Sequence, residues 1–547
     1  TGKFENTGTI TSTGTGSNAV VLEKGTGTLT FDNKGNLIAN TEGTVALYVK
    51  DGATFKHTSG KITAGNGAVG IYSIGTGTTG TIAAPIEVQG STASKTGIGV
   101  YSDGQSVNTF NTGAELQLGN GTVGLFSAKT SKFNNTFVIN DLKASLDDNA
   151  VLAYFKGDSP TASENEVTLS GSSVNNLTIT KMGKNSALFY GAAGSKVTLG
   201  ESINLVGNPK FSNISTDAQV LVTKDGTAIV DTGKIITSNL KTTISALGTN
   251  GGTRGNAENK GTLDLSNSKT STAMYLESSR GLNSKDILVG NKSTGIYGIY
   301  KDSTPVYSGA PAGTVNKGTI TTTATSKITI GDESSAIYAI GFDKVENNGS
   351  ITGGDKSVGI YAKNTSASSK LIDVENTGNI TLGKGTAGIY IAPETTNASN
   401  ATVVNSGNIT VGDSTLNSRG NVESTSVGIF VKNKTNLTTT GDVTVGNKGF
   451  ALYGNDSTLT VNGGNYNFAN NGSLAYLENN AVLNYNNAGT LTTSSEPMLY
   501  IINSKAQMNN NDIIVSSKGT GIYMTGTSTF GGWNNMTLNN SSTGIYV

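Results

Sequence analysis

The sequence predicts an all-β protein that folds as a right-handed parallel β-helix. Three observations support this fold class: a pair of short motifs recurs along the 547 residues, apolar residues alternate within each motif, and Gly or Asn stands at the bends. The pair is clearest at 374–391, which reads V-E-N-T-G-N-I-T-L-G-K-G-T-A-G-I-Y-I. A repeat that cannot bury an apolar face alone is typical of a solenoid, in which each coil packs on its neighbours.

The spacing of the second motif indicates the length of one coil. Toward the C-terminus its aromatic residue recurs every 23 or 24 residues, at Phe430, Tyr453, Tyr476, Tyr500, Tyr523 and Tyr546. We expect about three short strands in each coil and about 20 coils in the chain.

The residues within each motif favour strands over helices. Alternating apolar residues, as at Ala387, Ile389 and Ile391, predict strands that are buried on one face. Gly and Asn at intervals of a few residues would each destabilise a helix by up to about 1 kcal/mol. At the bends, the same residues adopt left-handed conformations at little cost. Equivalent strands then pair in parallel, about 4.8 Å apart.

Alternation also predicts which side chains face inward. We expect an apolar column inside the coils, formed by Ile360, Ile389, Ile429, Leu452, Leu499 and Ile522. Asn376 and Asn405 fall on the same inward side, where they can form a hydrogen-bonded ladder. Gly388 and Tyr390 should face outward. Because an aromatic residue recurs in almost every coil, we favour stacking that stabilises the scaffold over a sugar- or protein-binding platform.

The repeat predicts a single continuous β-helix segment over 1–547. The motifs are less regular between 156 and 260, and both ends of the chain fall within the repeat pattern. Longer polar stretches interrupt the repeat at 302–313, 364–370, 393–400 and 413–423. We expect these stretches to leave the helix as loops, and such insertions often carry binding in solenoids.

Composition excludes several classes of function. The formal net charge is +0, charged residues make up 14% of the chain, and there is no cysteine. The neutral balance and only three arginines argue against nucleic-acid binding, while the lack of cysteine excludes disulfides and thiolate metal sites. No apolar run approaches the roughly 20 residues of a membrane span.

The sequence shows no constellation of catalytic residues. Asp and Glu are scattered singly rather than clustered, as polysaccharide lyases or hydrolases would need. The single histidine, His57, aligns with the position of Glu375 in another repeat, so we expect it at the surface. We therefore expect no enzyme activity, no catalytic residue, no cofactor and no metal ligand.

The combination of N-T-G-x-I-T with G-T-x-G-I-Y, in a Gly-, Thr- and Asn-rich chain without cysteine, resembles the passenger domains of giant type V monomeric autotransporter adhesins, especially those of fusobacteria. The resemblance implies an extracellular protein of a Gram-negative bacterium, anchored in the outer membrane through a C-terminal β-barrel of the full-length protein. It transfers no functional residue, because the matching motifs belong to the scaffold.

The function implied by the resemblance is attachment to other bacteria or to host cells through an extended rod with protruding loops. The expected partner is a surface glycan or a protein receptor. Two alternatives stay open, a carbohydrate-active β-helix enzyme and an inert spacer stalk, since fold alone does not determine function.

Two groups of side chains are candidates for binding. Tyr307 and Arg419, in the first and last of the polar stretches, come first because aromatic and arginine residues are enriched among binding hot spots. The outward aromatic column is the second candidate, and its members of interest are Tyr361, Tyr390, Tyr453 and Tyr476.

Overall fold

The computed structural model describes residues 2–128, 136–157, 166–169, 175–192, 194–248, 255–301, 318–364, 372–393, 401–419, 421–469, 471–516 and 518–547. The elements named in these ranges are all strands, and residues 166–169 are described as strand backbone only. The chain divides into two compact units, Thr1–Leu263 and Asp264–Val547. Together the units contain about 18 turns of a parallel β-solenoid, close to the expected number of coils.

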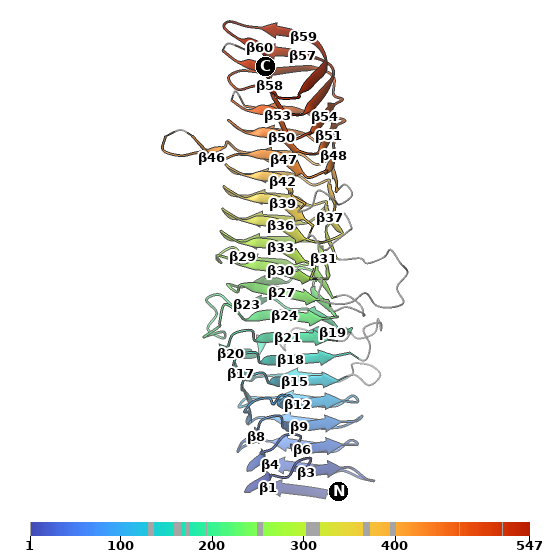
Figure 1. Cartoon of the computed structure of the whole chain (residues 1–547). Helices are drawn as coiled ribbons and strands as arrows, with labels where there is room; N and C mark the ends of the chain where they lie inside the picture. The colour runs from blue at the N-terminus through green and yellow to red at the C-terminus, as the bar shows by residue number, and fades with distance from the viewer. Residues whose placement is uncertain are drawn as a thin grey trace, which may run out of the picture. The chain divides into compact units, whose positions relative to one another are not determined.

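Each turn of unit 1 contributes one strand to each of three faces (Figure 1). We call the face that carries most of the recurring aromatic residues the aromatic sheet; its strands in unit 1 are β3 (Asn18–Glu23), β6 (Val45–Lys50), β9 (Val69–Ile74), β12 (Ile98–Asp103), β15 (Val123–Ala128), β18 (Val151–Lys156), β21 (Ala187–Ala192), β24 (Gln219–Lys224) and β27 (Thr242–Leu247). The first side face contains β1 (Gly2–Asn6), β4 (Leu29–Asn33), β7 (Thr54–His57), β10 (Thr79–Ile82), β13 (Val107–Phe110) and β16 (Thr136–Ile139), then β19 (Glu166–Leu169), β22 (Lys196–Leu199), β25 (Thr227–Val230) and β28 (Asn256–Asn259). The second side face contains β2 (Thr9–Ser12), β5 (Asn36–Ala39), β8 (Ile62–Ala64), β11 (Pro85–Val88), β14 (Glu115–Leu118), β17 (Leu142–Leu146) and β20 (Leu177–Met182), then β23 (Ile203–Asn204) and β26 (Ile235–Thr237).

Unit 2 repeats this arrangement. Its aromatic sheet contains β30 (Thr272–Glu277), β33 (Thr294–Ile299), β36 (Ser335–Ile340), β39 (Val358–Lys363), β42 (Ala387–Ile391), β47 (Val427–Lys432), β50 (Phe450–Asn455), β53 (Ser473–Glu478), β56 (Leu499–Ile502), β58 (Thr520–Thr525) and β60 (Thr543–Tyr546). The first side face contains β31 (Arg280–Asn283), β34 (Thr319–Thr322), β37 (Lys344–Asn347), β40 (Asp373–Asn376), β43 (Thr402–Asn405), β48 (Asn436–Thr439), β51 (Thr458–Val461), β54 (Val482–Tyr485), β57 (Lys505–Val515) and β59 (Thr529–Leu538). The second contains β32 (Asp286–Val289), β35 (Lys327–Ile330), β38 (Ser350–Gly353), β41 (Ile380–Leu382), β44 (Ile409–Val411), β49 (Val443–Val445) and β52 (Tyr466–Phe468). β29 (Thr262–Leu265) precedes β32 in this sheet, and β55 (Thr490–Thr493) pairs with the C-terminal half of the long strand β57. The parallel β-helix with three short strands per coil is thereby confirmed.

Unit 1 is irregular where the motifs are least regular. The register between β17 and β20 shifts after Ala144, and β20 itself pairs with the next turn through two single bridges, from Ile179 to Phe211 and from Met182 to Ile214. In that next turn, the two-residue strand β23 pairs forward with β26, whereas Phe211 and Ile214, which follow β23 in the chain, bridge back to β20.

The expected apolar column of unit 2 is confirmed. Parallel register aligns Ile360 with Ile389, and Ile389 with Ile429, across β39, β42 and β47. The side chains of Ile360, Ile389, Ile429, Leu452, Leu499 and Ile522 have no solvent exposure. Because each side chain packs on equivalent residues one coil before and one coil after, the core is continuous within the unit.

The orientation expected for Gly388 is wrong. A Cβ atom built on Gly388 would lie 2.5 Å from Cγ2 of the buried Ile409, so this position faces the core. The paired register passes from Ala387 opposite Val427 directly to Ile389 opposite Ile429. The alternation of inward and outward side chains is therefore interrupted here, and the consecutive residues Gly388 and Ile389 are both buried. Leu474 occupies the same position in β53 and is likewise buried.

The asparagine ladder is confirmed on the first side face of unit 2. Nδ2 of Asn347 donates to Oδ1 of Asn376 at 2.7 Å, and Nδ2 of Asn376 donates to Oδ1 of Asn405 at 2.7 Å. Each asparagine also donates to the carbonyl oxygen of the glycine two residues later, as Asn376 does to Gly378 at 2.9 Å. The ladder thus provides hydrogen bonds to buried backbone carbonyl groups at the bend. Loss of these hydrogen bonds would cost free energy.

The surface position expected for His57 is also wrong. His57 has no solvent exposure, and it pairs in register with Asn33, whose Oδ1 accepts a hydrogen bond from Nδ2 of Asn6 at 2.8 Å in an equivalent ladder of unit 1. Nδ2 of Asn33 donates to Nδ1 of His57 at 3.0 Å, and Nε2 of His57 lies 3.2 Å from the carbonyl oxygen of Pro85, to which it donates. The repeat motif predicts a register for His57 that differs by one residue from the register in the structure. A shift of one residue moves a side chain to the opposite face of the strand.

The burial of His57 predicts that unit 1 is sensitive to acid. Burial lowers the pKa of His57, so the neutral ring is favoured in the folded state. The stability that the neutral ring of His57 gives to the fold is fully present above its unfolded-state pKa of about 6.5. As pH falls below that value, the free energy of unfolding decreases by at most about 1.4 kcal/mol per pH unit. His57→Asn, which restores the ladder residue, should flatten the dependence of the thermal midpoint on pH between pH 8 and pH 5. An unchanged dependence would contradict this assignment.

Candidate functional site

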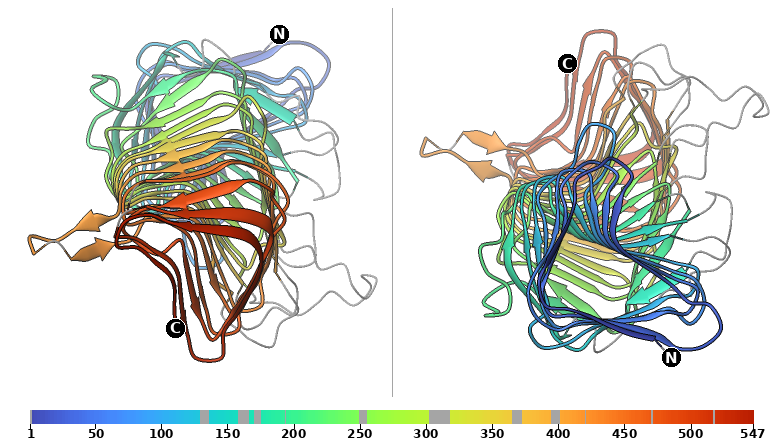
Figure 2. Two further views of the ribbon diagram at one scale, coloured as in Figure 1. Left: turned by 90° about the horizontal axis from the view of Figure 1, so that it is seen from above. Right: turned by 90° about the horizontal axis from the view of Figure 1, so that it is seen from below.

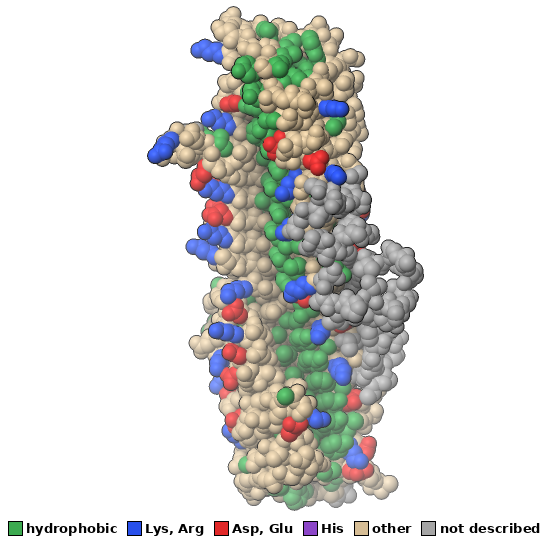
Figure 3. Space-filling view, in the orientation of Figure 1, with side chains coloured by type: hydrophobic (Ala, Val, Ile, Leu, Met, Phe, Trp, Pro, Cys, Tyr) green, Lys and Arg blue, Asp and Glu red, His purple; other side chains and the backbone are tan. Residues whose placement is uncertain are grey.

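The four tyrosines of the aromatic column lie on the outer face of unit 2. Their rings and that of Phe430 follow one another from coil to coil at centroid distances of 5.4 Å (Tyr361 to Tyr390), 4.3 Å (Tyr390 to Phe430), 4.7 Å (Phe430 to Tyr453) and 4.9 Å (Tyr453 to Tyr476); the Phe430–Tyr453 pair is tilted by 32° and the other pairs are stacked. Burial between neighbouring rings raises the pKa of all four tyrosine hydroxyls, which stay protonated and able to donate at neutral pH. Figure 3 shows the resulting band of hydrophobic side chains on this face.

One polar stretch forms an element of its own. The described residues of the stretch 413–423, together with Ser424, contain the hairpin of β45 (Thr415–Leu416) and β46 (Val422–Ser424), an antiparallel pair that projects from the coils of unit 2 (Figure 2). Arg419 lies near its tip and is exposed. The hairpin is inserted at the bend that leads from the second side face into the aromatic sheet. The stretch 302–313, with Tyr307, lies outside the described residues, as do residues 394–400.

Serine side chains attach the base of the hairpin to the coils on both sides. Oγ of Ser414 donates to the carbonyl oxygen of Lys448 in the next coil at 2.7 Å, and Oγ of Ser424 donates to that of Gly385 in the preceding coil at 3.0 Å. Buried Ser426 donates to the carbonyl oxygen of Asp413 at 2.9 Å. The base of the hairpin is therefore held in place by hydrogen bonds.

One asparagine holds the described residues near the tip together. Oδ1 of Asn417 accepts hydrogen bonds from the backbone N–H groups of Arg419 at 2.9 Å and Asn421 at 3.1 Å. On the two strands of the hairpin, Leu416 is 47% exposed and Val422 is 44% exposed. The hairpin thus presents two apolar side chains and one guanidinium to solvent, and arginine is a residue type enriched among binding hot spots.

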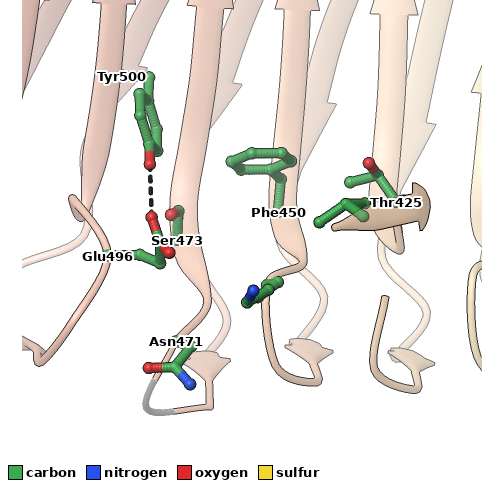
Figure 4. Close-up of a pocket in the computed structure, with 8 residues that line it drawn as sticks. Thr425, Phe450, Asn471, Ser473, Glu496 and Tyr500 are labelled. Atoms are coloured by element: carbon green, nitrogen blue, oxygen red, sulfur yellow. Dashed lines mark hydrogen bonds between the residues drawn. The ribbon is translucent and has the colours of Figure 1, made fainter. Parts of the chain in front are cut away.

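A groove of about 230 Å³ lies beside the hairpin on the aromatic sheet. Its lining comes from the hairpin and from three successive coils: Val422, Thr425, Lys448, Phe450, Asn471, Ser473, Glu496 and Tyr500. Figure 4 shows Phe450, Ser473 and Tyr500 projecting from neighbouring strands. The hydroxyl of Tyr500 donates to Oε2 of Glu496 at 2.8 Å. Burial, then this carboxylate, raises the pKa of Tyr500 well above its usual value.

Phe450 gives the groove its apolar wall. It occupies a register position that Val427 fills in the preceding coil and Ser473 in the next. Because both neighbours are smaller, the ring can lean across the sheet toward later coils. Its centroid lies 5.3 Å from that of Tyr476 and 5.9 Å from that of Tyr500, with an interplanar angle of 85° to Tyr500. Phe450 and Tyr500 therefore form two walls at nearly a right angle.

A second hollow of about 480 Å³ adjoins the groove at the bend. It is lined by Lys384, Asp413, Ser414, Thr415, Leu416, Asn447, Lys448 and Asn471. Lys448 and Asn471 line both hollows, which places the second one beside the groove. It has no aromatic wall, so its chemistry is that of hydroxyl, amide and charged groups.

Arg419 was identified from sequence, whereas the groove was missed. Phe450 could have been noticed, because F-A-L-Y at 450–453 has a large aromatic residue where V-G-I-F at 427–430 has valine. Glu496 and Asn471 have no comparable signal in the repeat. The four tyrosines are brought together in one column, but none of them lines the groove.

Within the described parts of the chain, no group of three or more His, Cys, Asp or Glu residues is placed to hold a metal ion. None of the described segments forms a helix long and apolar enough to cross a membrane.

Comparison with known proteins identifies a family for this fold. The family model of the BigA third pectate lyase-like domain matches residues 143–483, which is more than half of the chain and includes the hairpin. No curated protein and no solved structure matches the chain. The match agrees with the β-solenoid architecture and points to a bacterial surface or extracellular protein. The chain belongs to the family of the BigA third pectate lyase-like domain.

Proposed function

We propose that this chain is a segment of a bacterial adhesin that attaches the cell to other bacteria or to host cells. In this proposal, the full-length protein is an autotransporter-like protein anchored in the outer membrane, and the β-helix displays binding elements at the cell surface. The observation that carries the proposal is the hairpin β45–β46, which interrupts a regular scaffold with an ordered and exposed surface. A surface that repeats in every coil offers many equivalent weak sites, whereas a single insertion can be shaped for one partner.

The lining of the groove favours binding over catalysis. Hydrolysis of a glycosidic bond ordinarily needs two carboxyl groups that flank the bond. The groove beside the hairpin has one carboxyl group in its lining, that of Glu496, and this group accepts a hydrogen bond from Tyr500. A pectate lyase-like family name describes the fold, and fold alone does not determine activity.

Removal of the hairpin tests the proposal. Replacing residues 413–426 with Lys-Gly-Thr, the bend at 384–386 of the preceding coil, should leave the β-helix folded, because the flanking strands β44 and β47 keep their partners. We expect adherence of the purified chain to bacterial and epithelial cells to fall at least about ten-fold, as expected when a hot spot is lost.

A second variant separates the side chains of the hairpin from its backbone. It keeps the hairpin length but replaces Leu416, Arg419 and Val422 with Ser. Loss of adherence in both variants supports recognition by these side chains. If the chain without the hairpin adhered as well as the parent, the hairpin would be dismissed and the outward tyrosine column would become the leading candidate.

A further inference from the structure

We infer that the groove beside the hairpin binds a neutral hexose residue of a surface glycan, with the next sugar of the glycan in the adjoining hollow. This inference rests on the proposed adhesive function and names its ligand class.

The walls of the groove match the two kinds of surface on a pyranose ring. One face of many hexoses is a patch of C–H groups, which packs on an aromatic ring, and the hydroxyl groups project from the rim. Phe450 and Tyr500 are half-buried and supply the aromatic walls. Glu496 can accept hydrogen bonds from hydroxyl groups, Lys448 can donate them, and the Asn471 amide can do both.

The size of the groove limits the ligand to one small ring. Its volume of about 230 Å³ is below the roughly 300–1,000 Å³ typical of sites for drug-sized molecules. The adjoining hollow has about 480 Å³ and shares Lys448 and Asn471 with the groove. A chain of sugars can therefore pass from the aromatic groove to the polar hollow without leaving the surface.

Charge favours a neutral sugar. Among the groove-lining residues, one ammonium group, that of Lys448, is balanced by one carboxylate, that of Glu496. Nucleic acid would need clustered Lys and Arg. An apolar peptide would cover the ammonium group of Lys448 and the amide of Asn471 without offering them hydrogen bonds, at a cost in free energy.

Binding to a glycan array tests the inference. The probes are immobilised neutral glycans that end in a hexose, sialylated glycans, and peptides rich in aromatic residues. We expect the parent to bind neutral glycans and Phe450→Val to bind them at least about ten-fold more weakly, since an aromatic contact of about 1.4 kcal/mol corresponds to that factor. Valine is the residue found at this position in the preceding coil, so the fold should tolerate it.

Two further variants give the matched controls. Tyr361→Val removes a ring of the outward aromatic column, three coils before the coil of Phe450 and outside the groove lining, and it should leave glycan binding unchanged. Lys384→Ser alters only the adjoining hollow. It should weaken binding of a disaccharide several-fold while leaving binding of the monosaccharide unchanged.

The possible results distinguish failure of the proposed sugar site from failure of the proposed adhesive function. Equal loss in Phe450→Val and Tyr361→Val would overturn the assignment of the groove, as would binding to sialylated glycans or peptides alone. If the parent adhered equally to cells with and without enzymatic removal of surface glycans, the chain would be an adhesin but the sugar site would be wrong. If it bound neither cells nor glycans, both proposals would fail.

Discussion

Replacing Ile389 with Asp should destabilise the middle of unit 2 by at least about 4 kcal/mol. Ile389 has no solvent exposure and packs in register between Ile360 and Ile429. The substitution removes buried apolar volume, which alone costs about 2–5 kcal/mol, and it introduces a carboxylate that no partner neutralises. We expect a lower thermal midpoint and new protease cleavage sites close to the substitution, because each coil packs on its neighbours.

Thr381→Asp provides the control for this experiment. Thr381 lies on β41 of the same coil, but it is exposed, so a carboxylate there stays in water. Its thermal midpoint should match that of the parent, since surface substitutions usually change stability by less than about 0.5 kcal/mol. Equal protease resistance of Ile389→Asp and Thr381→Asp would contradict the burial of the apolar column.

Replacing Asn376 with Leu should cost about 3 kcal/mol, although leucine has a similar size. Asn376 accepts from Asn347 and donates to Asn405 and to the carbonyl oxygen of Gly378, and it has no solvent exposure. Leucine leaves the Oδ1 atom of Asn405 and the carbonyl oxygen of Gly378 without these donors, and each such buried group costs about 1–3 kcal/mol. Denaturant unfolding followed by circular dichroism measures the change.

Asn376→Thr distinguishes the effect of losing the hydrogen bonds of the ladder from the effect of losing the asparagine side chain itself. Thr439 follows Asn405 in the same ladder, and its hydroxyl accepts from Nδ2 of Asn405 at 3.2 Å. A threonine at 376 can therefore continue the ladder, and we expect less than half of the loss seen with leucine. Equal losses in the two variants would show that packing, rather than hydrogen bonding, dominates at this position.

The hairpin and the groove give the two functional proposals a shared structural basis. Ser414 and Ser424 fix the base of the hairpin on neighbouring coils, and Val422 of the same hairpin lines the groove. Replacement of the hairpin should therefore affect both the exposed side chains and one wall of the groove. Phe450→Val leaves the hairpin intact, so comparison of the two variants assigns any adhesion to one surface or the other.

Much of the scaffold was determined by the sequence alone. The three strands per coil, the buried Ile389 column and the ladder of Asn376 each depend on a pattern that is local and repeats at a nearly constant spacing. A side chain that alternates within a strand has its face set by parity, and repetition in the next coil sets its neighbour. For these features, no knowledge of distant contacts was needed.

Other features were decided only by the tertiary structure. Gly388 faces the core because the strand departs from simple alternation there. His57 is buried because it pairs with Asn33, which occupies an inward position, and not with the outward residue that precedes Asn33. Phe450 and Tyr500 meet because parallel stacking places β50, β53 and β56 side by side, so that a ring on one coil reaches a ring two coils later. Such contacts depend on the register between coils and on the size of the intervening side chain, Ser473, and neither is visible in a single motif.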